Sequence, residues 1–218
     1  MTEVSRIWDE KKVKGMAKVW RDPNELDDSA LENDRHWRLI NSVFKFVEGD
    51  SILDVGCGLG HLYVLAKNKY NYSGIDGSRE MIKTAQSFYP DDAEKFRAGD
   101  AYDLSEYGMY DTVVASGLLL HLYHPLLACN QMWGKANRCI VFSVWVGNSP
   151  MKWEGRQPIY KRVFGIKDKN GVLQRRDTLS SVASMLKTLN GITKVSSEPF
   201  PNPYDGESNY IFKVSKNR

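Results

Sequence analysis

The segment that most constrains this chain is Ser51-Ile-Leu-Asp-Val-Gly-Cys-Gly-Leu-Gly60. Its first half is a short apolar run that contains one acidic residue, Asp54, and its second half places glycine at three alternate positions. An amphipathic helical pattern follows directly, which predicts a strand, a turn and a helix in succession. An ordinary turn between a strand and a helix needs only one glycine. Three of them favour a turn whose backbone N–H groups approach a ligand closely, with no Cβ in the way.

Strand and helix patterns alternate from residue 51 to residue 145. Strands are predicted over 52–55, 72–76, 94–99, 110–116 and 138–145. The helices between them carry start signals, with Ser78 as an N-cap and Pro125 in a first turn. Such alternation requires a parallel sheet with right-handed crossovers. The predicted fold class is therefore α/β, with a Rossmann-like, doubly wound sheet.

The rest of the chain divides into three parts. Residues 1–48 predict N-terminal helices over 3–21 and from Ser29 to about Gly49, either as a lid or as an extension packed on the main domain. The main domain is predicted over 49–218 and closes with a helix capped by Thr178 and two strands, 192–198 and 209–214. Residues 146–177 have no clear period and carry eight basic and three acidic residues, a net +5. We expect this insertion to form a cap over a substrate.

Two further acidic residues stand at predicted strand ends. Asp76 comes 22 positions after Asp54, at the spacing of the carboxylate that accepts from ribose hydroxyls in nucleotide-binding α/β folds. Asp100, followed by Ala101, ends the next strand and is placed to accept from an adenine amino group. The alternatives are a charge at a helix N-terminus for Asp76 and an ordinary turn residue for Asp100.

Composition and cysteine usage set the broad class. The chain has 218 residues, 42% of them hydrophobic, and a net charge of +3, which predicts one soluble domain and argues neither for nor against a polyanionic partner. The three cysteines show no C-x-x-C spacing, so we expect no disulfide framework or zinc site and a reducing, cytoplasmic location. We also expect no signal peptide and no membrane span, because no apolar run approaches about 18 residues.

Four motifs in order then resemble a known family. The stretches ILDVGCGLG, SGID, AGDA and YDTVVASGLLLHL resemble the successive motifs of class I S-adenosylmethionine-dependent methyltransferases, on their small-molecule branch. The resemblance is close over 51–145 and looser over 178–214. Its glycines are spaced G-x-G-x-G, whereas a dinucleotide-binding fingerprint needs G-x-G-x-x-G. The resemblance implies a seven-stranded sheet with an antiparallel last strand, S-adenosylmethionine as cofactor and S-adenosylhomocysteine as product.

The resemblance also implies a set of cofactor-binding residues. Those around the methionine part are Asp54, Gly56, Cys57, Gly58 and Gly60, with Ser116 and Leu118 beneath it. Those around the adenosine are Asp76 for the ribose, Gly77 and Met81 nearby, and Asp100 and Ala101 at the adenine. Cys57 is expected to be a small side chain tolerated beside the ligand, and not a reactive thiol.

Methyl transfer from a sulfonium needs alignment, a dry site and sometimes a base. His121 is the predicted catalytic base, because imidazole titrates near neutrality and the family often has a histidine there. The alternative is that His121 only shapes the pocket, because this histidine recurs in the family while the substrates vary. His124 and Tyr123 stand at the same rim. Metal-dependent relatives use acidic ligands at the positions of Ser116 and Asn148, so no catalytic metal is predicted.

Several functions stay open at this stage. The first is a methyltransferase that acts on an O or N of a small-molecule acceptor, with aromatic residues of 146–177 lining the pocket. The second is an RNA methyltransferase whose +5 segment contacts phosphates, although basic loop residues are usually only solvated. An NAD(P)-dependent oxidoreductase is the third, and a non-catalytic partner subunit on the same fold is the fourth. The acceptor itself and the oligomeric state are not predictable from these patterns.

Overall fold

The computed structural model describes residues 10–19, 35–146, 166–167, 173–174, 177–201 and 208–217. The capping box predicted at Ser29 lies outside these residues, as do most of the insertion and the proline-rich loop after residue 201. The statements below concern the described residues. Within them, no helix is both long and apolar enough to cross a membrane.

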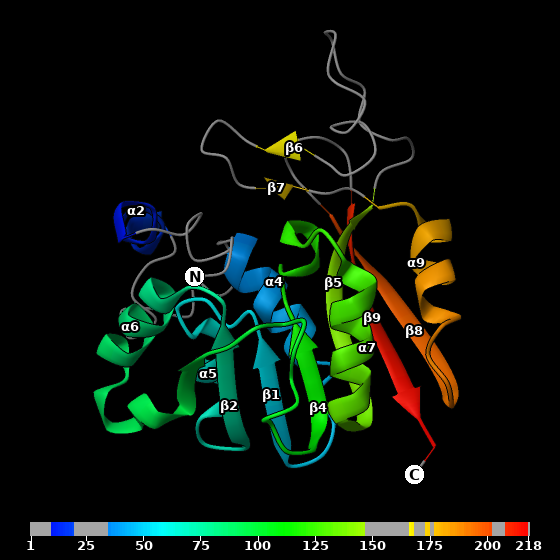
Figure 1. Cartoon of the computed structure of the whole chain (residues 1–218), viewed down its shortest axis with the longest axis horizontal. Helices are drawn as coiled ribbons and strands as arrows, with labels where there is room; N and C mark the ends of the chain where they lie inside the picture. The colour runs from blue at the N-terminus through cyan, green and yellow to red at the C-terminus, as the bar shows by residue number, and fades with distance from the viewer. Residues whose placement is uncertain are drawn as a thin grey trace, which may run out of the picture.

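Seven strands form one twisted sheet (Figure 1). They are β1 (Ser51–Val55), β2 (Asn71–Asp76), β3 (Phe96–Ala98), β4 (Tyr110–Ala115), β5 (Ala136–Val146), β8 (Ile192–Pro201) and β9 (Ser208–Lys216). Their order across the sheet is β3-β2-β1-β4-β5-β9-β8. Pairings among β1 to β5 are parallel, and β9 is antiparallel to both β5 and β8. The predicted fold, with an antiparallel last strand, is therefore confirmed.

Helices cover both faces of the sheet. One face carries α4 (Arg35–Phe44), α5 (His61–Ala66) and α6 (Arg79–Phe88), and the other carries α7 (Pro125–Lys135) and α9 (Leu179–Leu186). The predicted start signals hold, because the Ser78 side chain accepts from the Met81 N–H and Pro125 stands in the first turn of α7. At α9, Thr178 and Ser181 form a reciprocal capping box.

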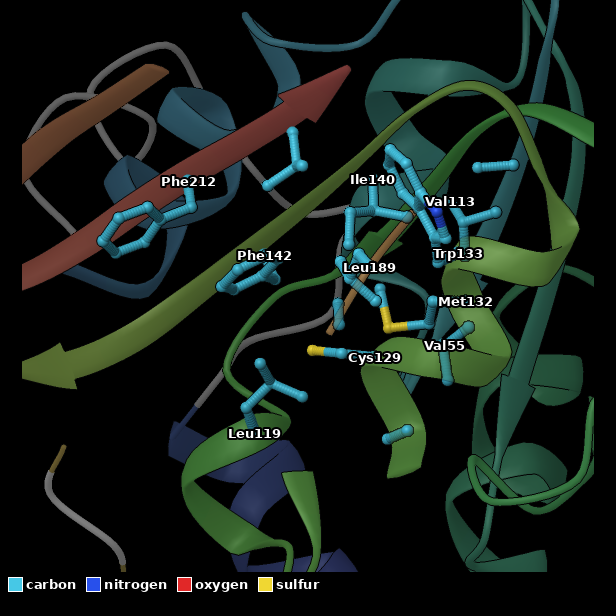
Figure 2. Packing of buried hydrophobic residues seen from close by; sticks show 14 of the residues in the cluster. Val55, Val113, Leu119, Cys129, Met132, Trp133, Ile140, Phe142, Leu189 and Phe212 are labelled. Atoms are coloured by element: carbon cyan, nitrogen blue, oxygen red, sulfur yellow. The ribbon is translucent and has the colours of Figure 1, made fainter. Parts of the chain in front are cut away.

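Strand alternation sends successive side chains into two separate cores. Leu53 and Val55 of β1 pack in the core under α7 and α9, whereas Ile52 packs in the core under α4, α5 and α6. Figure 2 shows part of the first core, where Phe142 of β5, Met132 of α7 and Phe212 of β9 come together. Truncating a fully buried side chain such as Phe142 to alanine costs about 3–5 kcal/mol. The two cores hold the strand ends in place.

Some element bounds differ from the sequence predictions. The strand predicted over 94–99 is shorter, because Pro90–Lys95 form a 3₁₀ turn, η2, and β3 begins only at Phe96. The helix predicted to reach Gly49 ends at Phe44, although Trp37, Ile40 and Val43 form its buried stripe as expected. The insertion contains a two-stranded pair that no pattern predicted, β6 (Ile166–Lys167) with β7 (Leu173–Gln174).

Candidate functional site

The glycine loop between β1 and α5 stands at the carboxyl end of the parallel strands. Gly56, Gly58 and Gly60 all have positive φ, at 76°, 54° and 81°. L-residues with a Cβ rarely adopt this conformation, which explains why glycine recurs at alternate positions. The loop is fixed to the neighbouring strand, because the N–H groups of Gly56 and Cys57 both donate to the Ile75 carbonyl, at 2.7 and 2.9 Å.

Two of these glycines also have no room for a side chain. A Cβ on Gly56 would lie 2.8 Å from Cδ1 of Leu118, so Leu118 packs directly against the loop. A Cβ on Gly60 would lie 2.9 Å from the rings of Phe96 and Tyr89. The Tyr89 hydroxyl also donates to the Gly60 carbonyl at 3.2 Å. Leu118 on one side and aromatic rings on the other therefore set the shape of the loop.

Asp54 lies at the end of β1 and is almost fully buried, with 3% of its surface exposed. Its Oδ2 accepts a hydrogen bond of 2.8 Å from the Tyr72 hydroxyl on β2. Burial raises the pKa of the Asp54 carboxyl to about 7, while the Tyr72 hydrogen bond acts in the opposite direction. The carboxyl group therefore lies beneath the loop rather than at the surface.

Asp76, at the end of β2, joins the loop to the start of α6. Its Oδ2 accepts from the Gly58 N–H at 3.0 Å and its Oδ1 accepts from the Ser78 N–H at 2.8 Å. Burial raises the pKa of the Asp76 carboxyl above its ordinary value, and the two backbone hydrogen bonds offset part of that rise. A carboxylate has about four lone-pair sites, so these bonds leave capacity to accept from two adjacent hydroxyls. Gly77 and Met81 follow within one helical turn.

The segment after β3 contains the two residues predicted at the adenine. Asp100 is exposed, and its Oδ1 accepts from the Tyr102 N–H at 2.9 Å. Ala101 is half-buried and packs against the core under α7. The turn conformation expected of an Asp at this point is therefore present, and its second carboxylate oxygen is available at the surface.

The segment after β4 forms the other side of the site. The Gly117 N–H donates to the Oγ of Ser143, a buried residue of β5, at 2.8 Å. The buried Oγ of Ser116 has no hydrogen-bond partner in the described part of the chain. A buried hydroxyl of this kind is uncommon in native structures and needs a partner to offset its desolvation. Leu118 then turns back onto Gly56.

The predicted base lies further along the same segment. His121 is the last residue of η3 (Leu119–His121), and its N–H donates to the Leu118 carbonyl at 2.8 Å. His124 is exposed at the N-cap of α7, with its N–H donating to the Tyr102 hydroxyl at 3.2 Å. Tyr123 is half-buried between them. The chain thus places His121 next to the Leu118 contact with the glycine loop.

The cysteines and carboxylates of the site show no metal-binding pattern. Among the described residues, no group of three or more His, Cys, Asp or Glu side chains is arranged to hold a metal ion. Cys57, Cys129 and Cys139 are buried, free thiols. Burial together with the charges of Asp54 and Asp76 raises the pKa of the Cys57 thiol well above its ordinary value. The Cys57 side chain is therefore a poor nucleophile at neutral pH.

Two peripheral elements adjoin this edge of the sheet. Val13 of α2 (Glu10–Val19) is buried against Leu59 of the loop and Met81 of α6. On the opposite side, β7 contacts η3, and Figure 1 shows the β6–β7 pair above the carboxyl ends of the parallel strands. Asp177, at the end of the insertion, is tied to β5 by its N–H bond of 2.9 Å to the Trp145 carbonyl.

Comparisons with known proteins identify the central region. Residues 52–139 match the family model described as a methyltransferase domain. A probable fatty acid methyltransferase of Pseudomonas putida is 28% identical over 137 residues, which cover 59% of this chain and 34% of that protein. The O-methyltransferase cnsE of Penicillium expansum is 29% identical over 121 residues, 52% of this chain and 44% of that protein. A tRNA U34 carboxymethyltransferase of Pseudoalteromonas atlantica is 30% identical over 104 residues, 45% of this chain and 32% of that protein.

The alignments thus span less than half the length of these curated relatives. The whole chain matches in fold. Magnesium protoporphyrin IX methyltransferase of Synechocystis PCC 6803, solved with bound S-adenosylmethionine, superposes with a TM-score of 0.70 at 17% identity, covering 98% of this chain and 95% of that chain. The central region of this chain is therefore similar to methyltransferase domains, and the chain as a whole has the fold of a methyltransferase solved with S-adenosylmethionine.

The residues of this site fit S-adenosylmethionine, the molecule bound in that solved structure. Gly58 places backbone without a side chain beside the Asp76 carboxylate, and the Ser116 hydroxyl lacks a partner in the described structure. A carboxylate suits a ribose, and an unpaired hydroxyl suits the polar end of an amino acid. The structure brings together Asp54, Cys57, Asp76 and Leu118 around the loop. Asp100 lies on an exposed turn directly after Gly99, whose N–H donates to the Asp76 carbonyl at 3.0 Å.

Sequence reasoning missed three residues that support this site. Tyr72 bonds to Asp54, Ser143 holds Gly117, and Leu59 packs under α2. Tyr72 carried only a weak signal, its place two residues before Gly74 on the same face of β2, because the pairing of Gly74 with Asp54 comes from the strand register. Ser143 had a weaker one, as a polar residue within an otherwise apolar strand.

Proposed function

We propose that this chain is an S-adenosylmethionine-dependent methyltransferase that transfers a methyl group to an O or N of a small-molecule acceptor. The observation that carries the proposal is the glycine loop, anchored on the Ile75 carbonyl, with Asp76 accepting from the Gly58 N–H. This arrangement puts a carboxylate beside a turn that carries no side chain at Gly56 and Gly58, where the carboxyl ends of β1 and β2 meet.

We assign each residue of the cofactor site to one part of S-adenosylmethionine. The methionine part lies against the loop, with Ser116 and Leu118 beneath it, and Asp76 accepts from the ribose hydroxyls. Asp100 and Ala101 contact the adenine, and Gly77 and Met81 border the adenosine. Two aspartates near the loop make its surroundings negative, which suits a ligand that carries a sulfonium and an ammonium group.

The chemistry asks for little beyond alignment. S-adenosylmethionine, when bound, supplies a methyl group that its sulfonium already activates. His121 takes the proton that an acceptor hydroxyl or amine loses as the new bond to carbon forms, so charge and atoms balance. This role is supported by the position of His121 at the end of η3, three residues after Leu118, whose side chain packs against Gly56 of the loop. The buried strands on either side of the loop help to keep water out.

The acceptor side is formed by the peripheral elements. We assign residues 1–48 as a lid and 146–177 as a cap over the acceptor. Two contacts support this assignment: Val13 of α2 packs on Leu59 of the loop, and β7 packs on η3. A small-molecule acceptor is favoured because two relatives are named as a probable fatty acid methyltransferase and an O-methyltransferase.

RNA is the second candidate acceptor. It is favoured by the net +5 of residues 146–177 and by a relative named as a tRNA U34 carboxymethyltransferase. Phosphate contacts from such a segment predict an RNA affinity that falls steeply with salt concentration. Binding that is absent or independent of salt leaves the small-molecule acceptor.

The test is transfer of a labelled methyl group from S-adenosylmethionine into cell extract that has been separated into small-molecule and RNA fractions. The proposal predicts label in the small-molecule fraction, and no label with a Gly58→Arg variant. Label confined to RNA favours the second candidate. Absence of transfer to either fraction, with intact cofactor binding, contradicts an enzymatic role.

A further inference from the structure

Tyr72, the buried hydrogen-bond partner of Asp54, has no part in the roles assigned under the proposed function. Asp54 lies between Leu53 and Val55, which both face the core under α7 and α9. Its own side chain therefore points to the opposite face of the sheet, where Tyr72 also lies. A carboxyl group on this apolar face would be costly without a donor, and the Tyr72 hydroxyl is the donor that it has, at 2.8 Å.

The strand register explains how Tyr72 reaches Asp54. In the parallel pairing of β1 with β2, Ile52 is opposite Tyr72 and Asp54 is opposite Gly74. The tyrosine ring must therefore run along β2 and pass over Gly74. A Cβ on Gly74 would lie 2.8 Å from the Tyr72 hydroxyl and 3.0 Å from both Cβ and Sγ of Cys57. Glycine at position 74 is what leaves the path open.

The ring of Tyr72 is held by other aromatic rings. Its centroid is 5.0 Å from that of Tyr63 in α5 and 5.9 Å from that of Phe96 in β3. Only 1% of Tyr72 is exposed. Few rotamers are open to a ring packed in this way, so the hydroxyl presents its donor to Asp54 from a fixed direction.

The surroundings of Asp54 disfavour its ionised form, whereas the hydrogen bond from Tyr72 favours it. Burial and the nearby Asp76 raise the pKa of the Asp54 carboxyl, and the hydrogen bond from Tyr72 lowers it, with a result of about 7. The Cys57 thiol stays neutral because burial and both carboxylates raise its pKa. The Tyr72 hydroxyl also keeps its proton, since burial and Asp54 raise its pKa well above the ordinary value.

We propose that Tyr72 is a positioning residue for cofactor binding. Its hydroxyl holds the Asp54 carboxylate in one orientation beneath the glycine loop and favours the ionised form, so that the loop presents negative charge to the cationic methionine end of the cofactor. Tyr72 acts through Asp54 and does not touch the cofactor. The inference rests on the proposed cofactor site.

The test compares Tyr72→Phe with wild type in calorimetric titrations with S-adenosylmethionine between pH 6 and 8.5. Wild-type affinity should fall as pH drops through about 7, where Asp54 takes up a proton. The variant keeps the ring but lacks the donor, so the pKa of Asp54 rises further. We expect binding about 10-fold weaker at pH 7, with the midpoint of the pH profile moved to higher pH and affinity partly recovered at pH 8.5.

Two control variants test whether the pH profile of cofactor binding comes from the Asp54–Tyr72 pair. Tyr110→Phe removes another tyrosine hydroxyl from the sheet, one that donates to Ser73 at 3.0 Å, and it should keep the wild-type profile. Asp54→Asn should bind weakly, without the step near pH 7. If Tyr72→Phe does not fold, Gly74→Ala serves in its place, because the added methyl group pushes the hydroxyl away from Asp54.

The outcomes separate the inference from the function on which it rests. Wild type that fails to bind S-adenosylmethionine overturns both. Wild type that binds, with Tyr72→Phe giving the same affinity and the same pH midpoint, overturns the positioning role alone. An equal loss of affinity at every pH also overturns it, since a structural defect does not move a titration midpoint.

Discussion

The cofactor side and the acceptor side of this molecule are built in different ways. On the cofactor side, the glycine loop, Asp76 and Ser116 all lie at the carboxyl ends of neighbouring parallel strands, and hydrogen bonds to backbone groups fix the loop and Asp76. On the acceptor side, α2 and the β6–β7 pair come from segments outside the strand–helix alternation and reach the site by packing on Leu59 and η3. The binding site for the methyl donor thus follows from local backbone geometry, whereas the acceptor side depends on packing between distant segments.

This difference has a physical origin. A strand end followed by glycines at positive φ has one geometry, set by steric limits on the backbone. A helix such as α2 contributes through small apolar side chains, Val13 and Ala17, that pack against Leu59 and Met81, and many other sequences can supply such contacts. Changes on the cofactor side should therefore have larger effects than changes at the periphery.

The largest effect is expected from Gly58→Arg. Gly58 has φ of 54° and donates its N–H to Asp76, so an arginine strains the backbone and fills the loop. We expect affinity for S-adenosylhomocysteine to fall at least about 1000-fold, or roughly 4 kcal/mol, measured by calorimetry. Gly108→Arg is the matched control, because a Cβ there meets nothing within 4 Å. Equal affinities for the two variants would show that the loop is misassigned.

His121→Ala should have the next largest effect, on rate rather than on binding. Loss of a general base lowers kcat by about 100-fold, while the affinity for S-adenosylhomocysteine stays unchanged. His124→Ala, at the exposed N-cap of α7, should leave kcat near normal. Steady-state kinetics with the identified acceptor makes the measurement. A near-normal kcat for His121→Ala would restrict His121 to shaping the pocket.

Asp76→Asn tests the two hydrogen bonds by which Asp76 links the glycine loop to the start of α6. The amide keeps one acceptor oxygen, but its NH₂ group would face the N–H of either Gly58 or Ser78 and leave it unpaired. We expect cofactor affinity to fall about 30-fold, the equivalent of roughly 2 kcal/mol for lost bonds to a charged group. Asp103→Asn is the control, since Asp103 accepts from the Ser105 N–H on an exposed turn. Similar losses in both variants would argue against a ligand role for Asp76.

The smallest effect is expected at the periphery. Val13→Asp puts a charge where α2 packs on Leu59 and Met81, so α2 should detach from the loop. Cofactor affinity should fall about 5-fold, near 1 kcal/mol, with little change in the melting temperature of the main domain. Lys14→Ala, which removes only an exposed pair with Glu10, should change neither quantity. A Val13→Asp affinity equal to wild type would mean that α2 is not a lid over the cofactor.

The sequence was most informative where local geometry decides structure. The positive φ at Gly56, Gly58 and Gly60 and the N-cap of Ser78 follow from residue type alone, and the structure contains each of them. The parallel sheet follows from the alternation of patterns, and its antiparallel last strand follows from the family resemblance.

The sequence was least informative where a contact joins distant segments. The Tyr72 bond to Asp54 depends on the register of β1 with β2, and the Ser143 bond to Gly117 depends on that of β4 with β5. Neither register can be derived from one strand. The β6–β7 pair consists of two residues in each strand, which is too short for a periodic pattern.

The central claim is that the loop at 56–60 binds S-adenosylmethionine and not a dinucleotide. Its most direct test is a calorimetric titration of the wild-type chain with S-adenosylmethionine and, separately, with NADH. The account predicts saturable binding of S-adenosylmethionine at one site, displaced by S-adenosylhomocysteine, and no response to NADH. Tight binding of NADH with no response to S-adenosylmethionine would contradict it.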